Sequence, residues 1–116
     1  MDIAPELYRR ILDKAQNAER PFEQTEPASV GLGLGVSLRR QGRAAEAAKA
    51  LESALREKEL SANARILISL ELGKTYDRLG RRTSAQGQYR RVLALEDYRG
   101  SREEARRHYR RPYQGR

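Results

Sequence analysis

Residues able to perform acid–base, nucleophilic or metal chemistry are scarce in this sequence. His108 is the only histidine among the 116 residues, and there is no cysteine. A catalytic triad or a zinc site would have to be built around His108 alone, without thiolate ligands. Glu103 and Glu104 instead suit the first turn of a helix, where they can pair with arginine or histidine one turn later. We therefore expect a protein that is not an enzyme and that holds no metal or cofactor.

Glycine and leucine alternate in the stretch GLGLG, residues 31–35. A dinucleotide-binding loop requires the spacing G-x-G-x-x-G after a strand, and a P-loop ends in Gly-Lys followed by Ser or Thr. Neither context surrounds this stretch. Its glycines are interpreted as positions at which two helices approach closely, because glycine inside a helix otherwise costs about 1 kcal/mol relative to alanine.

Arginine is concentrated in the last third of the chain. Residues 81–116 hold 11 arginines, no lysine and four acidic residues, so seven of the eight net positive charges lie there. Such an excess forms either a solvated helix end or an electrostatic docking surface for an acidic partner. Three tyrosines are interleaved with the arginines, an arrangement common on surfaces that bind single-stranded nucleic acid. The candidate basic patch comprises Arg90, Arg91, Arg102, Arg106, Arg107, Arg110 and Arg111.

Composition and length indicate a single all-α domain. Hydrophobic residues make up 38% of the chain and charged residues 34%, with no tryptophan, which suits long surface-rich helices. Apolar residues recur with the helical period, and no segment alternates as a strand would. No run of about 18 apolar residues predicts a membrane span, and the first residues lack the pattern of a secretory signal. We expect a cytoplasmic protein of bacterial type.

Start and stop signals divide the chain into helices. Gly42 and Gly80 follow apolar-periodic segments and are expected to end helices in the left-handed conformation. Helix starts are expected at the cap Ser61 and at the capping boxes Thr83–Gln86 and Ser101–Glu104.

These signals predict the following organisation of one domain. The helices are expected at 4–18, 27–41, 44–58, 61–79, 83–96 and 101–111. Residues 19–26 form a linker, residues 27–58 a first repeat, residues 61–97 a second repeat, residues 101–111 a basic capping helix, and residues 112–116 a frayed tail.

The two repeats are related by a constant offset of 38 residues. Leu34-Gly35 corresponds to Leu72-Gly73, Leu38 to Tyr76, Gly42 to Gly80, Ala47 to Ala85, and Leu51 to Tyr89. This constancy indicates a duplicated helix–turn–helix. We expect the helices of each hairpin to cross where Gly35 faces Ala47 and Gly73 faces Ala85, with Leu38–Leu51 and Tyr76–Tyr89 filling the grooves. The frame Ala-x3-Tyr-Arg-Arg recurs at residues 4–10, 85–91 and 105–111, and its tyrosine is expected to face the core.

The second repeat resembles the tetratricopeptide repeat family through LGKTY at residues 72–76 and AQGQY at residues 85–89. The first repeat is similar but looser, with LGVSL and AAKAL. The family's early Trp position holds Gly31 and Ser69, its terminal Pro position holds Glu59 and Asp97, and the period is 38 rather than about 34 residues. The resemblance implies a stack of helical hairpins in a right-handed superhelix.

In that family the first helix of each hairpin lines a concave groove that receives a peptide or a partner helix. The resemblance therefore implies a groove lined by Leu32, Val36, Arg39, Arg40, Leu67, Leu70, Lys74, Asp77 and Arg78. Apolar residues flanked by cations favour a partner of acidic character. The Lys and Asn set of the family's carboxylate clamp is not present among these positions, so that activity is not carried over.

Two functions remain open from the sequence. The first is an adaptor or scaffold that binds a protein segment in the groove. The second is a nucleic-acid accessory protein that uses the C-terminal arginines, whose affinity would fall steeply with salt. Because fewer than three full repeats are present, the stack is also expected to dimerise or to be completed by another subunit.

Overall fold

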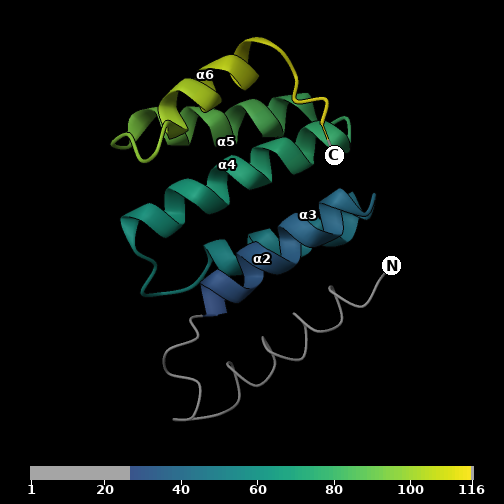
Figure 1. Cartoon of the computed structure of the whole chain (residues 1–116), viewed down its shortest axis with the longest axis vertical. Coiled ribbons are helices and arrows are strands. Elements are labelled where there is room, and N and C mark those ends of the chain that lie inside the picture. Colours follow the sequence, from purple (N-terminus) through teal and green to yellow (C-terminus); the bar gives the residue numbers. More distant parts are fainter. Residues whose placement is uncertain (1–26, 116) are drawn as a thin grey trace.

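The computed structural model describes residues 27–115, so the helix expected at 4–18 and the linker at 19–26 lie outside the described residues. All regular structure from residue 27 to residue 115 is helical, with no strand, which confirms the all-α class (Figure 1). The helices are α2 (Pro27–Arg40), α3 (Ala44–Leu55), α4 (Ala62–Arg78), α5 (Arg82–Ala94) and α6 (Ser101–Arg110).

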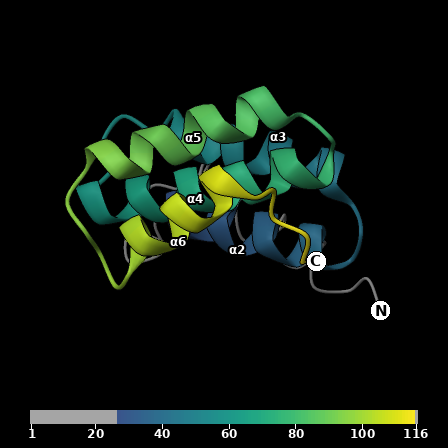
Figure 2. The same cartoon turned by 90° about the horizontal axis from the view of Figure 1, so that it is seen from above.

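The helices form two hairpins followed by a single helix. α2 packs against α3 and α4 against α5, and the two hairpins meet chiefly through α3 and α4. α4 also contacts both α2 and α6, whereas α3 and α5 make no such contact with each other. α2, α4 and α6 therefore form one layer, hereafter the α2–α4–α6 layer, and α3 and α5 lie on its other side (Figure 2).

The two hairpin turns are built by the same hydrogen bonds, 38 residues apart. Gly42 and Gly80 have φ angles of +82° and +74°, which glycine adopts without strain. The N–H of the residue after each glycine donates to the carbonyl five residues earlier, at 2.8 Å in the first turn and 2.9 Å in the second. This Schellman arrangement satisfies carbonyls that the helix end would otherwise leave unpaired. Both predicted glycine stops are confirmed.

The helix starts agree less well with the expected caps. Ser61 is confirmed, because its side chain accepts a hydrogen bond from the N–H of Ala64 at 3.1 Å. The prediction of a capping box at Thr83–Gln86 is wrong. α5 already begins at residue 82, and the side-chain amide of Gln86 donates to the carbonyl of Tyr109 at 3.2 Å.

The start of α6 also uses a different cap from the expected one. Ser101 is the first helical residue, and its hydroxyl accepts from the N–H of Tyr98 at 2.9 Å. Asp97 caps the helix instead, since its carboxylate accepts from the N–H of Arg102 at 3.0 Å. The expected reciprocal partner, Glu104, turns toward α4 and pairs with a lysine there.

Two helices end more than one residue earlier than the sequence predicts. α3 ends at Leu55 rather than at residue 58, and α5 ends at Ala94 rather than at residue 96. In both cases a leucine beyond the helix packs against the core, Leu60 after α3 and Leu95 after α5. Leaving the helix early lets these side chains bury apolar surface that a continued helix would direct elsewhere.

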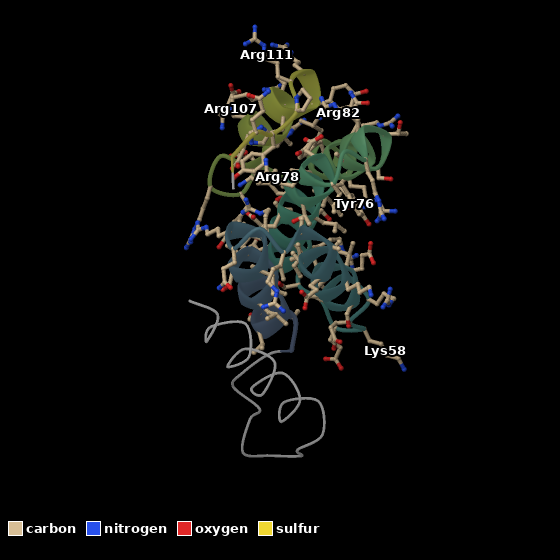
Figure 3. All side chains as sticks on the ribbon, turned by 90° about the vertical axis from the view of Figure 1, so that its right-hand side faces the viewer. Lys58, Tyr76, Arg78, Arg82, Arg107 and Arg111 are labelled. Atoms are coloured by element: carbon tan, nitrogen blue, oxygen red, sulfur yellow. The ribbon has the colours of Figure 1, made fainter. Side chains whose placement is uncertain are left out.

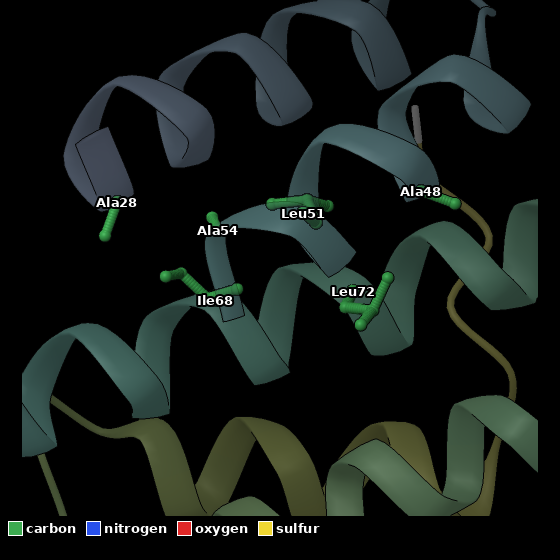
Figure 4. Packing of buried hydrophobic residues seen from close by; sticks show 6 residues of the cluster. All are labelled: Ala28, Ala48, Leu51, Ala54, Ile68 and Leu72. Carbon is green, nitrogen blue, oxygen red and sulfur yellow. The ribbon is translucent and has the colours of Figure 1, made fainter. Parts of the chain in front are cut away.

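The interface between the hairpins is an apolar cluster of small and branched side chains. Figure 4 shows how α2, α3 and α4 contribute to it. Its fully buried centre is formed by Leu51, Ile68 and Leu72, which are at most 1% exposed. Ala48 and Ala54 let α3 approach the larger side chains of α4 closely.

Each hairpin contains a glycine that makes room for a large side chain of the second helix. A Cβ at Gly35 would lie 2.5 Å from Leu51, and a Cβ at Gly73 would lie 2.5 Å from the ring of Tyr89. The predicted close approach is therefore confirmed, but its partner is not the expected alanine. The residue four positions after each alanine, Leu51 or Tyr89, lies against the glycine instead. Ala47 packs in the core with Leu34 and Leu38.

Tyr76 joins the two hairpins. It packs against the apolar clusters on both sides of α4, and its hydroxyl donates to the carboxylate of Glu52 at 2.6 Å. Burial and this hydrogen bond raise the pKa of Tyr76 to about 12, so the hydroxyl keeps its proton. The corresponding residue of the first repeat, Leu38, packs with Leu34 and Ala47 in a cluster separate from that of Leu51, which differs from the predicted Leu38–Leu51 pairing.

Candidate functional site at the end of the chain

The segment after α6 returns to the α2–α4–α6 layer, which corrects the expectation of a frayed tail. Beyond α6 the chain crosses back to the C-terminal end of α4 (Figures 1 and 2). The N–H of Tyr113 donates to Oδ2 of Asp77 at 2.9 Å, and its hydroxyl accepts from Nη1 of Arg39 at 2.8 Å. A non-helical segment is thus held by both its backbone and its side chain.

The ring of Tyr113 lies among cations and a second aromatic ring. The guanidinium of Arg39 is 5.1 Å from the ring centroid, and the ammonium of Lys74 is 5.2 Å from it, both within the range of cation–π attraction. The imidazole of His108 meets the ring edge-on, with centroids 5.2 Å apart. The tail site is defined as these three residues together with Asp77, and Tyr113 is its occupant.

Asp77 is the most enclosed charged group of the tail site, with a side chain 1% exposed. Besides the N–H of Tyr113, its carboxylate accepts the hydroxyl of Tyr89 at 2.7 Å and both of its oxygens lie 3.1 Å from Nη1 of Arg82. Burial and the hydrogen bond to Asp77 raise the pKa of Tyr89 far above its usual range. The Tyr89 hydroxyl therefore stays protonated and fixes one side of the carboxylate.

A chain of ion pairs connects the three helices of the layer beneath the tail. Arg39 of α2 pairs with Glu71 of α4 at 2.6 Å, and Glu71 also pairs with Lys74 at 3.2 Å. Lys74 pairs in turn with Glu104 of α6 at 2.7 Å. The side chains of Arg39, Lys74 and Glu71 are 3%, 12% and 18% exposed, so solvent screens their pairs less than it screens surface pairs.

The same contacts shift the pKa values of two groups on α6. Burial opposes ionisation of Glu104, but the hydrogen bond and charge of Lys74, helped by His108, outweigh it and lower the pKa of Glu104 below 4.5. Burial lowers the pKa of His108 below 6.5, assisted by the nearby charges of Lys74 and Arg107 and only partly offset by Glu104. The imidazole beside Tyr113 is therefore neutral at neutral pH.

We expect the stability of the protein to fall on mild acidification because of His108. Its pKa is lower in the folded state than the ordinary value of 6.5, so the unfolded chain takes up a proton first as the pH falls below that value. The free energy of unfolding should decrease between about pH 7.5 and about pH 5.5. Chemical unfolding at the two pH values measures this decrease, and His108→Gln should flatten it. An equal decrease in the wild type and the variant would contradict the assignment to His108.

The structure brings together only part of the groove set expected from the sequence. Arg39, Lys74 and Asp77 meet in the tail site, while Leu70 is a core residue, 4% exposed, and unavailable to a partner. Leu67 is half-buried, and Arg78 is exposed beside a hollow of about 320 Å³ next to the first hairpin turn. The remaining three, Leu32, Val36 and Arg40, line a separate hollow of about 520 Å³ on α2.

Several residues of the site have no strong signal in the sequence. Glu71 lies three residues before Lys74, which is a common spacing for a surface ion pair, but nothing in this pattern indicates burial against another helix. Tyr113 follows a proline outside every periodic segment, so helical pattern arguments do not reach it. The sequence predicts that Glu103 and Glu104 pair with Arg107 or His108 one turn later, and the structure places Nε2 of His108 3.4 Å from Oε2 of Glu104.

The arginines of the candidate basic patch are exposed. They include five on or next to α6 and two on α5. Within this set, Arg106 pairs with Glu103 at 3.1 Å, across an exposed contact that contributes little to stability. Arg107 and Arg111 extend into solvent at the α6 end of the stack (Figure 3).

The tyrosines expected among these arginines have partly structural roles. Tyr98 and Tyr109 both pack against the core cluster of Ile66, which agrees with a core-facing tyrosine in the frame at residues 105–111. The guanidinium of Arg99 lies 5.1 Å from the ring of Tyr98. Arg82 is drawn inward, where it donates to the carbonyl of Tyr109 at 2.6 Å.

No group of three or more histidine, cysteine or acidic residues suited to a metal ion occurs within residues 27–115. Across the same part of the chain, each helix is too short or too polar to cross a bilayer. No protein-family model, curated protein or solved structure matches the chain.

Proposed function

We propose that the protein is a non-catalytic adaptor, a short tetratricopeptide-like stack that binds an extended segment of a partner protein on the α2–α4–α6 layer. The observation that supports this most is the chain's own tail. A non-helical segment lies on that layer and uses its backbone N–H, its hydroxyl and its ring at once. A backbone hydrogen bond combined with a side-chain subsite is the usual way to recognise an extended peptide.

The repeated hairpin geometry also supports this proposal. The two turns use equivalent hydrogen bonds at an offset of 38 residues, and equivalent glycines accept Leu51 and Tyr89. The first helices contact one another while α3 and α5 do not, as expected of a stack that curves toward the first-helix side. Such curvature is the source of the binding surface in helical-repeat proteins.

Selection from a random-peptide library on the immobilised full-length protein tests the proposal. We expect enriched peptides that bind at micromolar or tighter affinity and lose binding when Lys74→Glu is introduced. Lys49→Glu is the matched control, because Lys49 is exposed on α3, outside the α2–α4–α6 layer. Failure to enrich any peptide, or equal loss in both variants, would contradict the adaptor function.

A second candidate is binding of a nucleic acid, which is favoured by the exposed arginines of α6. Arg102, Arg106 and Arg110 are spaced by four residues and are all exposed, so they follow one side of this helix. A polyanion bound there should release counterions, and its affinity should fall steeply as salt is raised. A gel shift at low salt that finds no complex at micromolar protein would exclude this candidate.

A further inference from the structure

The tail site has the properties of a built recognition site rather than of a surface contact. Its two polar anchors are nearly sealed from solvent, since Arg39 is 3% exposed and the side chain of Asp77 is 1% exposed. Each anchor contacts Tyr113 and also a second residue of the fold: Arg39 pairs with Glu71, and Asp77 accepts a hydrogen bond from Tyr89. The anchors are therefore held in place by the fold itself, which lowers the entropic cost of recognising a ligand.

Within residues 27–115, the ion pairs around the site balance in charge. Three cations, Arg39, Lys74 and Arg82, are paired there with three carboxylates, Glu71, Asp77 and Glu104. His108 adds no charge at neutral pH because its pKa is lowered by burial. An acidic ligand side chain would add a fourth negative charge. The three cations are already neutralised by their own carboxylates and would not compensate for it. The balance therefore favours a neutral ligand side chain over the acidic one expected from the sequence.

The other contacts of the tail site favour a phenol, the side chain of tyrosine, as the ligand group. Two cations and the edge of an imidazole surround an aromatic ring, and the guanidinium of Arg39 donates to its hydroxyl. A phenylalanine would keep the ring contacts but would lose the hydrogen bond that Arg39 donates to the hydroxyl, which weakens binding. An aliphatic side chain would lose both kinds of contact.

We propose that the tail site recognises a tyrosine in an extended segment of a partner protein, and that Tyr113 occupies the site until such a segment displaces it. This inference rests on the proposed adaptor function and specifies the side chain that the adaptor reads. Tyr113 is joined to α6 by only a few residues, so its effective concentration at the site is on the order of millimolar. A partner segment must compete with this tethered occupant.

Fluorescence anisotropy with the labelled peptide Arg-Pro-Tyr-Gln-Gly-Arg, which copies residues 111–116, tests both parts of the proposal. The full-length Tyr113→Ala protein should bind the peptide about tenfold or more tightly than the wild type, because the internal competitor is lost. Gln114→Ala, at an exposed position of the same tail, should behave as the wild type. Peptides with Phe or Glu in place of Tyr should bind Tyr113→Ala about tenfold more weakly.

The site itself is tested in the same assay by Arg39→Gln and Lys74→Gln, each introduced into Tyr113→Ala. Both substitutions should weaken peptide binding. Circular dichroism shows whether each variant folds, and if Arg39→Gln does not, the Lys74→Gln variant alone tests the site. Equal affinity of the wild type and Tyr113→Ala, or no preference for Tyr over Glu, would overturn the proposal. A concentration-dependent dimer that Tyr113→Ala abolishes would also overturn it, because the occupant would then be the tail of a second copy.

Failure of this inference can be separated from failure of the adaptor function. If library-selected peptides bind the α2–α4–α6 layer without a tyrosine preference, only the tyrosine assignment is lost. If no peptide of any sequence binds, both proposals are lost.

Discussion

Replacing Gly73 by alanine is expected to destabilise the protein, although the same change stabilises most helices. The new Cβ would lie 2.5 Å and 2.8 Å from two ring carbons of Tyr89. The ring cannot move aside easily, because Tyr89 is fully buried and its hydroxyl is tied to Asp77. Overpacking of this kind costs about 1–3 kcal/mol, against the ~1 kcal/mol that alanine gains over glycine inside a helix, so we expect a net loss of up to about 2 kcal/mol.

Gly87 provides the matched control for this prediction. It lies inside α5, and a Cβ at Gly87 would meet no atom within 4 Å. Gly87→Ala should therefore raise the free energy of unfolding by up to about 1 kcal/mol. Urea unfolding followed by circular dichroism compares the two variants, and a Gly73→Ala protein as stable as Gly87→Ala would refute the close helix approach.

Asp77→Ala should produce a large loss of stability for a single polar substitution. Removing the carboxylate leaves the hydroxyl of Tyr89 buried without its acceptor, separates Arg82 from its charge partner and removes the hydrogen bond made by the N–H of Tyr113. Since Arg82 is 29% exposed, its contribution is reduced by solvent and the buried hydroxyl carries more of the effect. We expect a loss of about 2–4 kcal/mol.

Glu103→Ala is the control for Asp77→Ala. Glu103 also pairs with an arginine, but its side chain is 74% exposed, so its removal should change stability by less than about 0.5 kcal/mol. Guanidinium unfolding of the two variants under the same conditions measures the difference. If Asp77→Ala lowered the free energy of unfolding no more than Glu103→Ala does, the buried carboxylate would not stabilise the C-terminal end of α4.

Much of the fold follows from local sequence signals. Gly42 and Gly80 end helices because they tolerate positive φ, and the 38-residue offset recurs in the hydrogen bonds of both turns. The expected capping boxes fail for a physical reason. Gln86 and Glu104 have better partners on a neighbouring helix or turn than at their own helix start, and tertiary contacts override local capping.

The candidate site is less accessible to sequence reasoning because it is assembled from distant segments. Arg39 and Tyr113 are separated by 74 residues, and no period or motif relates them. Arg39, Lys74 and Asp77 were expected to face a partner, and they do share one site. The residue that fills this site is the chain's own Tyr113, which only the course of the chain after α6 reveals.

Backbone amide NMR of the Tyr113→Ala protein shows whether the α2–α4–α6 layer binds an extended protein segment. The peptide Arg-Arg-Pro-Tyr-Gln-Gly-Arg, which copies residues 110–116, is titrated into the ¹⁵N-labelled full-length variant. We expect the chemical-shift changes to gather at Arg39, at residues 71–78 and at residues 104–108, with little change along α3. Changes confined to the exposed arginines of α6, or no saturable change at all, would contradict binding at this layer.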